Sequence, residues 1–162
     1  MRRFLSSLSD ETGSQLVEFG LVLLPLLGFV FLIMDVAWIC FAQSSLQHAV
    51  QVGVRSAVTS PSGNASQDAY IKSVVQQNAM GFLHGDPGLN AITINYYSPS
   101  NLSQALAGAG SNADGNVIEI VVKNVPVSCL GPILRENWST VFLQATSSDV
   151  MESSPGGVPP TR

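Results

Sequence analysis

The sequence has little of what most binding and catalytic sites are made of. Charged residues account for only 11% of the 162 residues, and the formal net charge is −4. Beyond residue 42 the basic residues stand singly, which argues against nucleic acid as a partner because a phosphate polyanion requires grouped lysines and arginines. The two histidines, His48 and His84, have no ligand-like neighbours, so we predict no metal site.

Cysteine is also scarce, with Cys40 and Cys129 as the only two. Two cysteines exclude a disulfide framework, but a single bridge stays open as an alternative if both lie on the oxidising side of a membrane. No GxSxG, HExxH, P-loop or dinucleotide-binding motif occurs, and the acidic residues form no cluster by spacing. The sequence therefore predicts a protein that is not an enzyme and holds no cofactor.

What the chain does have is one long apolar run near its N-terminus. Residues 19–34 carry no charge, and after Asp35 the run continues to Ala42. A helix over residues 16–42 would measure about 40 Å, more than the ~30 Å hydrocarbon core of a bilayer. A core helix would need a larger domain around it, and a cleaved signal peptide would need a shorter run ending in a small-x-small site. We therefore predict that residues 14–42 form a transmembrane helix that stays on the protein.

The residues around Glu18 resemble the cleavage pattern of type IV prepilins. A short polar leader ends at Gly13, and Ser14, three uncharged residues and Glu18 follow before the apolar helix. The resemblance implies a leader of residues 1–13 that a prepilin peptidase removes, with Ser14 as the first mature residue. It also implies that Glu18 neutralises the N-terminal ammonium of a neighbouring subunit during assembly, the alternative being an interfacial glutamate that reaches water. For Asp35 a wetted boundary residue and an assembly contact are both open.

A second pattern extends over the stretch from residue 13 to 58. Its residues are Val17, Glu18, Phe19, Pro25, Asp35, Leu46, Gln47, Ala49, Gly53 and Arg55. These residues match the TadE-like family, minor pilins or pseudopilins of the tight-adherence (Tad) pilus system, which the stretch resembles. The family often has Gly-Arg after the mid-helix acid, whereas this chain has Ala37 and Trp38, which leaves the partner of Asp35 undefined. Val54 stands where the family has alanine.

The resemblance implies a minor pilin or pseudopilin for Tad (type IVc-like) pilus assembly, adhesion or secretion. Its partners would be the membrane, a prepilin peptidase, other pilins or pseudopilins and the Tad assembly platform. Arg2 and Arg3 precede the span, so the positive-inside rule predicts a cytoplasmic N-terminus, a single pass through the bacterial inner membrane and an extracytoplasmic domain. The alternative is a signal-anchored extracellular binding domain outside any filament. Gly13 together with Glu18 favours the pilin, because a plain anchor needs neither.

Residues 43–150 predict a small α+β domain. Apolar residues at helical spacing continue the membrane helix to Thr59, and a second helix begins after Ser66 and closes at Gly85 and Pro87. Three alternating segments, 91–97, 116–125 and 139–147, predict a three-stranded antiparallel meander. An exposed loop is predicted between the first two strands, and a disordered tail over 151–162. The apolar loop between the last two strands is expected to fold against the core, with a contact to the membrane or to a partner subunit as the alternative.

Overall fold

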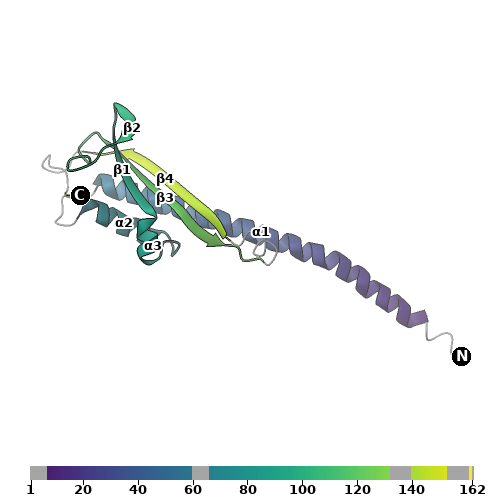
Figure 1. Ribbon diagram of the computed structural model, residues 1–162. Helices are drawn as coiled ribbons and strands as arrows, with labels where there is room; N and C mark the ends of the chain where they lie inside the picture. The colour runs from purple at the N-terminus through teal and green to yellow at the C-terminus, as the bar shows by residue number, and fades with distance from the viewer. Residues whose placement is uncertain (1–6, 60–65, 132–139, 153–160, 162) are drawn as a thin grey trace. The chain divides into compact units, whose positions relative to one another are not determined.

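The computed structural model describes residues 7–59, 66–131, 140–152 and 161 (Figure 1). The chain divides into two compact units. The first comprises Met1–Trp38 and Ser128–Ser139, and the second comprises Ile39–Val127 and Thr140–Arg162. Residues 1–6 of the predicted leader and most of the predicted tail lie outside the described residues.

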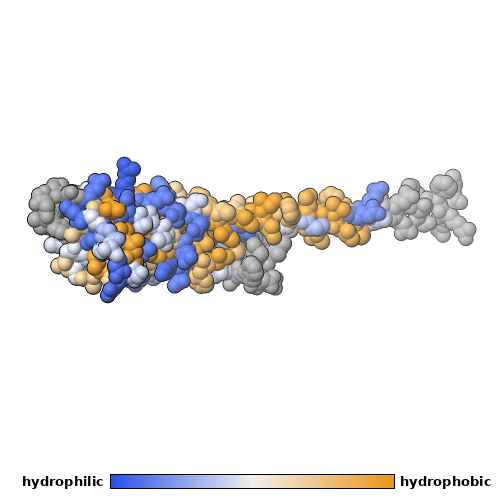
Figure 2. Space-filling view, turned by 90° about the horizontal axis from the view of Figure 1, so that it is seen from above, coloured by the Kyte–Doolittle hydropathy of each residue, from blue (hydrophilic) through white to orange (hydrophobic). Residues whose placement is uncertain are grey.

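The N-terminal helix, α1, runs without interruption over Ser7–Thr59. Pro25 lies inside it and does not end it, as expected of a membrane helix, where proline is tolerated. Within the described residues, the stretch Gly13–Thr59 is the one helix long and apolar enough to cross a membrane, and its most apolar 18-residue window is 0% buried. Hydrophobic side chains cover the face of this helix seen in Figure 2. An apolar surface of this length that the chain leaves uncovered indicates single-pass membrane anchoring.

The second unit is the predicted α+β domain, built on the C-terminal part of α1. From Ala42 onward one face of the helix is buried, and Figure 1 shows α2, β3 and β4 lying alongside it. The buried positions follow the helical period, which is why the sequence pattern predicted this face correctly. They are Ala42, Leu46, Ala49, Val50, Val54 and Ala57.

The second predicted helix is shorter than expected and is followed by a third. Helix α2 covers Gln67–Asn78, with Ser66 as its N-cap residue although the serine side chain makes no capping hydrogen bond. Met80 and Gly81 both adopt positive φ angles, of 46° and 89°, so the chain turns there instead of continuing the helix. Gly85 and Pro87 were expected to close a helix, but they belong to a short one, α3 (Gly85–Asn90), whose first turn accommodates a proline.

The sheet has four strands where the sequence predicted three. Strands β1 (Ile92–Ser98), β3 (Val117–Ser128) and β4 (Thr140–Val150) correspond to the three predicted segments. The additional strand, β2 (Asn101–Ala105), pairs antiparallel with β1 and gives the order β2-β1-β3-β4. Every residue of β2 is exposed, so it carries no alternation of buried and exposed positions that a sequence pattern could reveal.

The segment that follows β2 is also not simply the exposed loop that was predicted, because Ser111 and Asn112 are buried. The amide Nδ2 of Asn112 donates to Gln67 Oε1 at 2.6 Å, and Gln67 Nε2 donates to the Ala57 carbonyl at 3.1 Å. This chain of hydrogen bonds joins the loop to the start of α2 and the end of α1. Buried amides of this kind stabilise only when paired, and here they hold a polar segment in the core.

The core of the domain lies between the sheet and the two long helices. On the sheet, Ile94 of β1 stands opposite Ile120 of β3, and the alternate residues of both strands turn inward. Tyr96 is fully buried, and its hydroxyl donates to Asp68 Oδ1 of α2 at 2.9 Å, which satisfies the only polar atom of the side chain. The fully buried large side chains of the domain include Leu46, Val50, Ile71, Val75, Ile92, Tyr96, Ile118, Ile120 and Val122.

Candidate functional site

The residues implied in processing and assembly all lie on α1. Gly13, Ser14 and Glu18 are exposed, and a Cβ atom on Gly13 would meet nothing within 4 Å. Glu18 stands four residues after Ser14, so the two side chains share one face of the helix. The side chain of Glu18 is exposed, so a group from outside the chain can reach it.

Asp35 is in a different situation, because it is buried with only 1% of its surface exposed. Its Oδ1 accepts hydrogen bonds from the backbone N–H groups of Leu130 and Gly131, both at 2.7 Å. Within the described part of the chain, its Oδ2 is buried without a hydrogen-bond partner. Backbone donors at such short distances are well suited to a carboxylate in an apolar setting. The side chain therefore fixes the start of the β3–β4 loop to the membrane helix.

The close approach of this loop depends on Gly131. A Cβ atom at this position would lie 2.5 Å from Asp35 Oδ2, 3.2 Å from Asp35 Cγ and 3.4 Å from Phe31 Cβ. Any side chain would therefore push the loop off the helix and lengthen both hydrogen bonds to Oδ1. We call the arrangement of Asp35 with the backbone of Leu130 and Gly131 the aspartate clasp.

The aspartate clasp was not foreseen from the sequence, which offered only a wetted residue or an assembly contact for Asp35. The apolar segment 126–137 was expected against the domain core, with a membrane or partner contact as the alternative. Of its described residues, Pro126 and Val127 belong to the domain, whereas Ser128–Gly131 belong to the unit of the membrane helix. The signal that could have suggested this is an acid in an apolar helix together with a glycine in an apolar loop. A buried carboxylate needs donors, and a glycine lets backbone donors approach closely.

Further along α1, two glutamines connect the helix to the edge strand of the sheet. Gln43 Nε2 donates to the Gln144 carbonyl at 2.8 Å, and Gln47 Nε2 donates to the Thr146 carbonyl at 3.0 Å. Residues four apart on a helix lie on the same face, and carbonyl groups two residues apart on a strand point to the same edge. The two glutamines can therefore bind two carbonyl groups of one edge. β4 is the last strand of the sheet, and this pairing covers carbonyl groups that could otherwise recruit a foreign strand.

Gly53 is the point of closest approach between α1, α2 and β3. A Cβ atom on Gly53 would come closer than 3.0 Å to Val75 Cγ2 of α2 and within 3.3 Å of Ile120 Cδ1 of β3. The absence of a side chain at this position therefore allows three elements to meet. Gly53 has a structural role in the domain.

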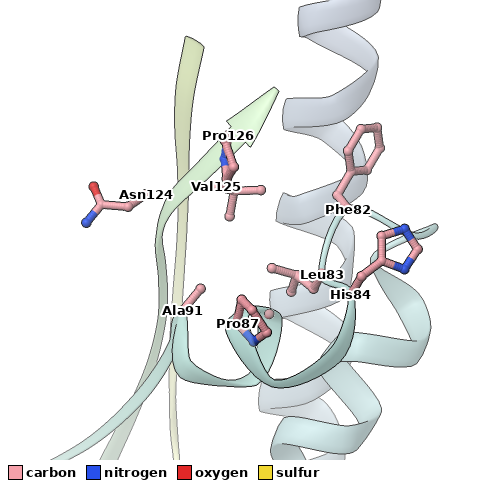
Figure 3. A pocket seen from close by; sticks show the side chains of 9 residues that line it. Phe82, Leu83, His84, Pro87, Ala91, Asn124, Val125 and Pro126 are labelled. Atoms are coloured by element: carbon pink, nitrogen blue, oxygen red, sulfur yellow. The ribbon is translucent and has the colours of Figure 1, made fainter. Parts of the chain in front are cut away.

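The rest of the described surface offers no chemistry of its own. A hollow of about 480 Å³ lies between α3 and the end of β3, where Figure 3 shows Leu83, Pro87 and Val125 around the space. Among the described residues of its lining, His84 is the only ionisable one. The described residues contain no group of three or more metal-ligating side chains. No disulfide joins the two cysteines, of which Cys40 is exposed and Cys129 buried.

One polar cluster lies on the sheet. Glu119 Oε2 accepts hydrogen bonds from Tyr97 Oη at 3.0 Å and from Asn95 Nδ2 at 3.1 Å. The hydrogen bond to Glu119 and, after it, burial raise the pKa of Tyr97 above its ordinary value of 10.0. The cluster joins side chains of β1 and β3 across the sheet.

All of these α1 residues lie in one segment that resembles a known protein family. The family model described as TadE-like protein matches residues 13–55. This segment is similar to the TadE-like family. No curated protein and no solved structure matches the chain. The TadE-like match begins at Gly13, ends at Arg55 and leaves the remainder of the domain uncovered.

The TadE-like residues fall into two groups in the structure. Glu18 at one end of the membrane stretch is exposed, whereas Asp35 at the other end is covered by the chain's own loop. The later matched residues belong to the domain, where Gln47 binds β4 and Gly53 admits α2. The TadE-like match therefore covers a helix with two parts. The first part has an exposed apolar surface, and the domain packs on the second part.

Proposed function

We propose that this protein is a minor pilin or pseudopilin of a Tad (type IVc-like) pilus. The observation that carries the proposal is the TadE-like segment 13–55, whose apolar stretch is uncovered by the chain while its second half supports a folded domain. Such a helix can hold the subunit in the bacterial inner membrane before assembly and pack against other pilin helices afterwards. Its C-terminal domain would lie on the extracytoplasmic side.

Processing by a prepilin peptidase belongs to the same proposal, with cleavage between Gly13 and Ser14. The exposure of both residues and the open space around Gly13 support access by a peptidase. Cleavage would leave a new ammonium group at Ser14, one helical turn from Glu18. The positive end of a helix favours a carboxylate nearby, so the pair is chemically matched.

Glu18 would act during assembly by neutralising the N-terminal ammonium of a neighbouring subunit. A charged side chain within a bilayer helix costs about 2.5–3.5 kcal/mol at the centre on insertion scales, and less towards the edge. Removing Glu18 should therefore ease insertion, while it removes an attraction that is strong where water is scarce. For Asp35 we propose an indirect role, through the loop that it holds.

The test is fractionation of cells that carry Glu18→Gln or Glu18→Ala, with processing measured separately. We expect both variants in the membrane at wild-type levels and depleted in sheared filaments or partner complexes. Asp149→Asn, which removes an exposed acid of β4, is the matched control and should assemble normally. Equal incorporation of every variant would mean that Glu18 is only interfacial and that the chain is an anchored binding domain.

A further inference from the structure

The aspartate clasp holds an exposed apolar side chain beside the membrane helix. Leu130 is 56% exposed, although its backbone N–H is fixed on Asp35 and its neighbour Cys129 is buried. The same unit exposes Met34 and Val36, each at 51%, on either side of Asp35 along α1. Leu130 therefore adds an exposed apolar side chain to the unit of the membrane helix, although it follows the end of β3 in the sequence.

The position of the clasp along α1 can be measured against a bilayer. The exposed apolar stretch from Leu16 to Met34 spans about 28 Å at 1.5 Å per residue, close to the ~30 Å of a hydrocarbon core. Asp35 follows this stretch directly. If the helix spans the membrane, as the proposed function requires, and this stretch fills the hydrocarbon core, Asp35 and the loop attached to it lie at the boundary between hydrocarbon and headgroups.

We propose that the loop Ser128–Gly131 is a second membrane contact, in which Leu130 lies among the lipids of the interface. This inference rests on the membrane anchoring in the proposed function. It follows from two features of the clasp. The loop is attached to α1 directly after the exposed apolar stretch, and it presents an exposed apolar side chain in the same unit as that stretch.

The chemistry of the clasp suits this environment. A backbone N–H that enters an apolar phase without an acceptor costs several kcal/mol, which keeps irregular loops out of lipid. Here Oδ1 of Asp35 accepts from the N–H groups of both Leu130 and Gly131, so α1 supplies the acceptor that these two loop donors need in a water-poor region. The donors in turn compensate a carboxylate at the end of an apolar helix, which would otherwise be costly to dehydrate.

The test is depth-dependent fluorescence quenching of the full chain in liposomes of a zwitterionic and an anionic phospholipid. An environment-sensitive dye is attached to Leu130→Cys in a background of Cys40→Ala and Cys129→Ala. Met34→Cys is the control at the same depth on the helix itself, and Leu102→Cys is the control on β2, where the leucine is 61% exposed. Quenchers are a nitroxide on the upper acyl chain and aqueous iodide.

We expect the lipid nitroxide to quench the dye at Leu130→Cys as strongly as at Met34→Cys, while iodide quenches only Leu102→Cys. Quenching at Leu130→Cys by iodide and not by nitroxide, with Met34→Cys still quenched by nitroxide, would overturn the inference and leave the anchoring intact. Protection of Leu130→Cys from both quenchers would also overturn it, in favour of a contact with a second copy of the chain. A dye at Met34→Cys that the nitroxide does not reach would contradict the membrane anchoring itself.

A second pair of variants tests whether the clasp positions the loop. Asp35→Asn keeps an acceptor oxygen for the two N–H groups, and Asp35→Ala removes it. Nitroxide quenching at Leu130→Cys should persist with Asp35→Asn and be lost with Asp35→Ala, while quenching at Met34→Cys stays unchanged in both. Equal quenching at Leu130→Cys in the two variants would show that the loop reaches lipid without the clasp and would overturn its positioning role.

Discussion

Replacing Gly53 with alanine should destabilise the domain, although alanine is the better helix former. In the interior of an exposed helix, Gly→Ala stabilises by about 1 kcal/mol. Here the new methyl group would come closer than 3.0 Å to Val75 Cγ2. Val75 is fully buried and β-branched, so a helix allows it essentially one rotamer and it cannot turn aside.

The magnitude follows from these opposing effects. Overpacking of a core typically costs about 1–3 kcal/mol of stability. The cost of Gly53→Ala should lie at the upper end of this range, because the side chain of Val75 cannot move away from the new methyl group. Subtracting the gain in helix propensity leaves a loss of about 2 kcal/mol, which for a domain of this size lowers the Tm by roughly 10 °C. Val75→Ala should make room for the methyl group, so the double variant should lose less stability than the sum of the single ones.

The assay is thermal unfolding of the full chain in detergent, monitored by circular dichroism. Gly20→Ala is the matched control, because a Cβ atom at Gly20 meets nothing within 4 Å and no loss is expected. A Tm for Gly53→Ala that is unchanged or raised would refute the reasoning, since it would mean that α1 and α2 do not approach closely at this position.

Two further predictions concern the aspartate clasp and the polar cluster of the sheet. Gly131→Ala should lift the loop from Asp35 and so speed the modification of the buried thiol of Cys129 by a maleimide. The exposed thiol of Cys40 is the internal reference. An unchanged rate of labelling at Cys129 would argue against the clasp. The pKa of Tyr97 lies above 10.0, so the phenol favours the folded state below about pH 10 and stability should fall as the pH rises further. Glu119→Gln should lower the pKa of Tyr97 towards its ordinary value. The measurement is a phenolate absorbance titration, in which the difference from Tyr97→Phe gives the signal of Tyr97. A pKa of Tyr97 that Glu119→Gln leaves unchanged would contradict the assigned cause.

The sequence predicted those parts of the fold that repeat with a regular period. The buried face of α1 from Ala42 to Ala57 and the alternation of Ile118, Ile120 and Val122 on β3 are local patterns, and the structure confirms both. Strand β2 escaped prediction because all of its residues are exposed, and its pairing with β1 is set by the turn at Ser98–Asn101. Exposed strands carry no hydrophobic period.

The candidate site divides in the same way. Gly13, Ser14 and Glu18 are neighbours in sequence, so their order could be recognised directly and remains a prediction about processing. The environment of Asp35 depends on Leu130 and Gly131, which come from a different part of the chain, and a contact over such a separation leaves no local pattern. Backbone donors in particular are invisible in a sequence, because every residue except proline has one.

The most direct test of the central claim is the N-terminal sequence of the mature protein, isolated from membranes of cells that contain the cognate prepilin peptidase. A prepilin-type subunit should begin at Ser14, and Gly13→Leu should abolish this terminus, whereas Gly20→Leu, an equally open position in the same helix, should preserve it. A mature protein that begins at Met1, or at a residue beyond Cys40, would contradict the proposal that this chain is a pilin-type subunit.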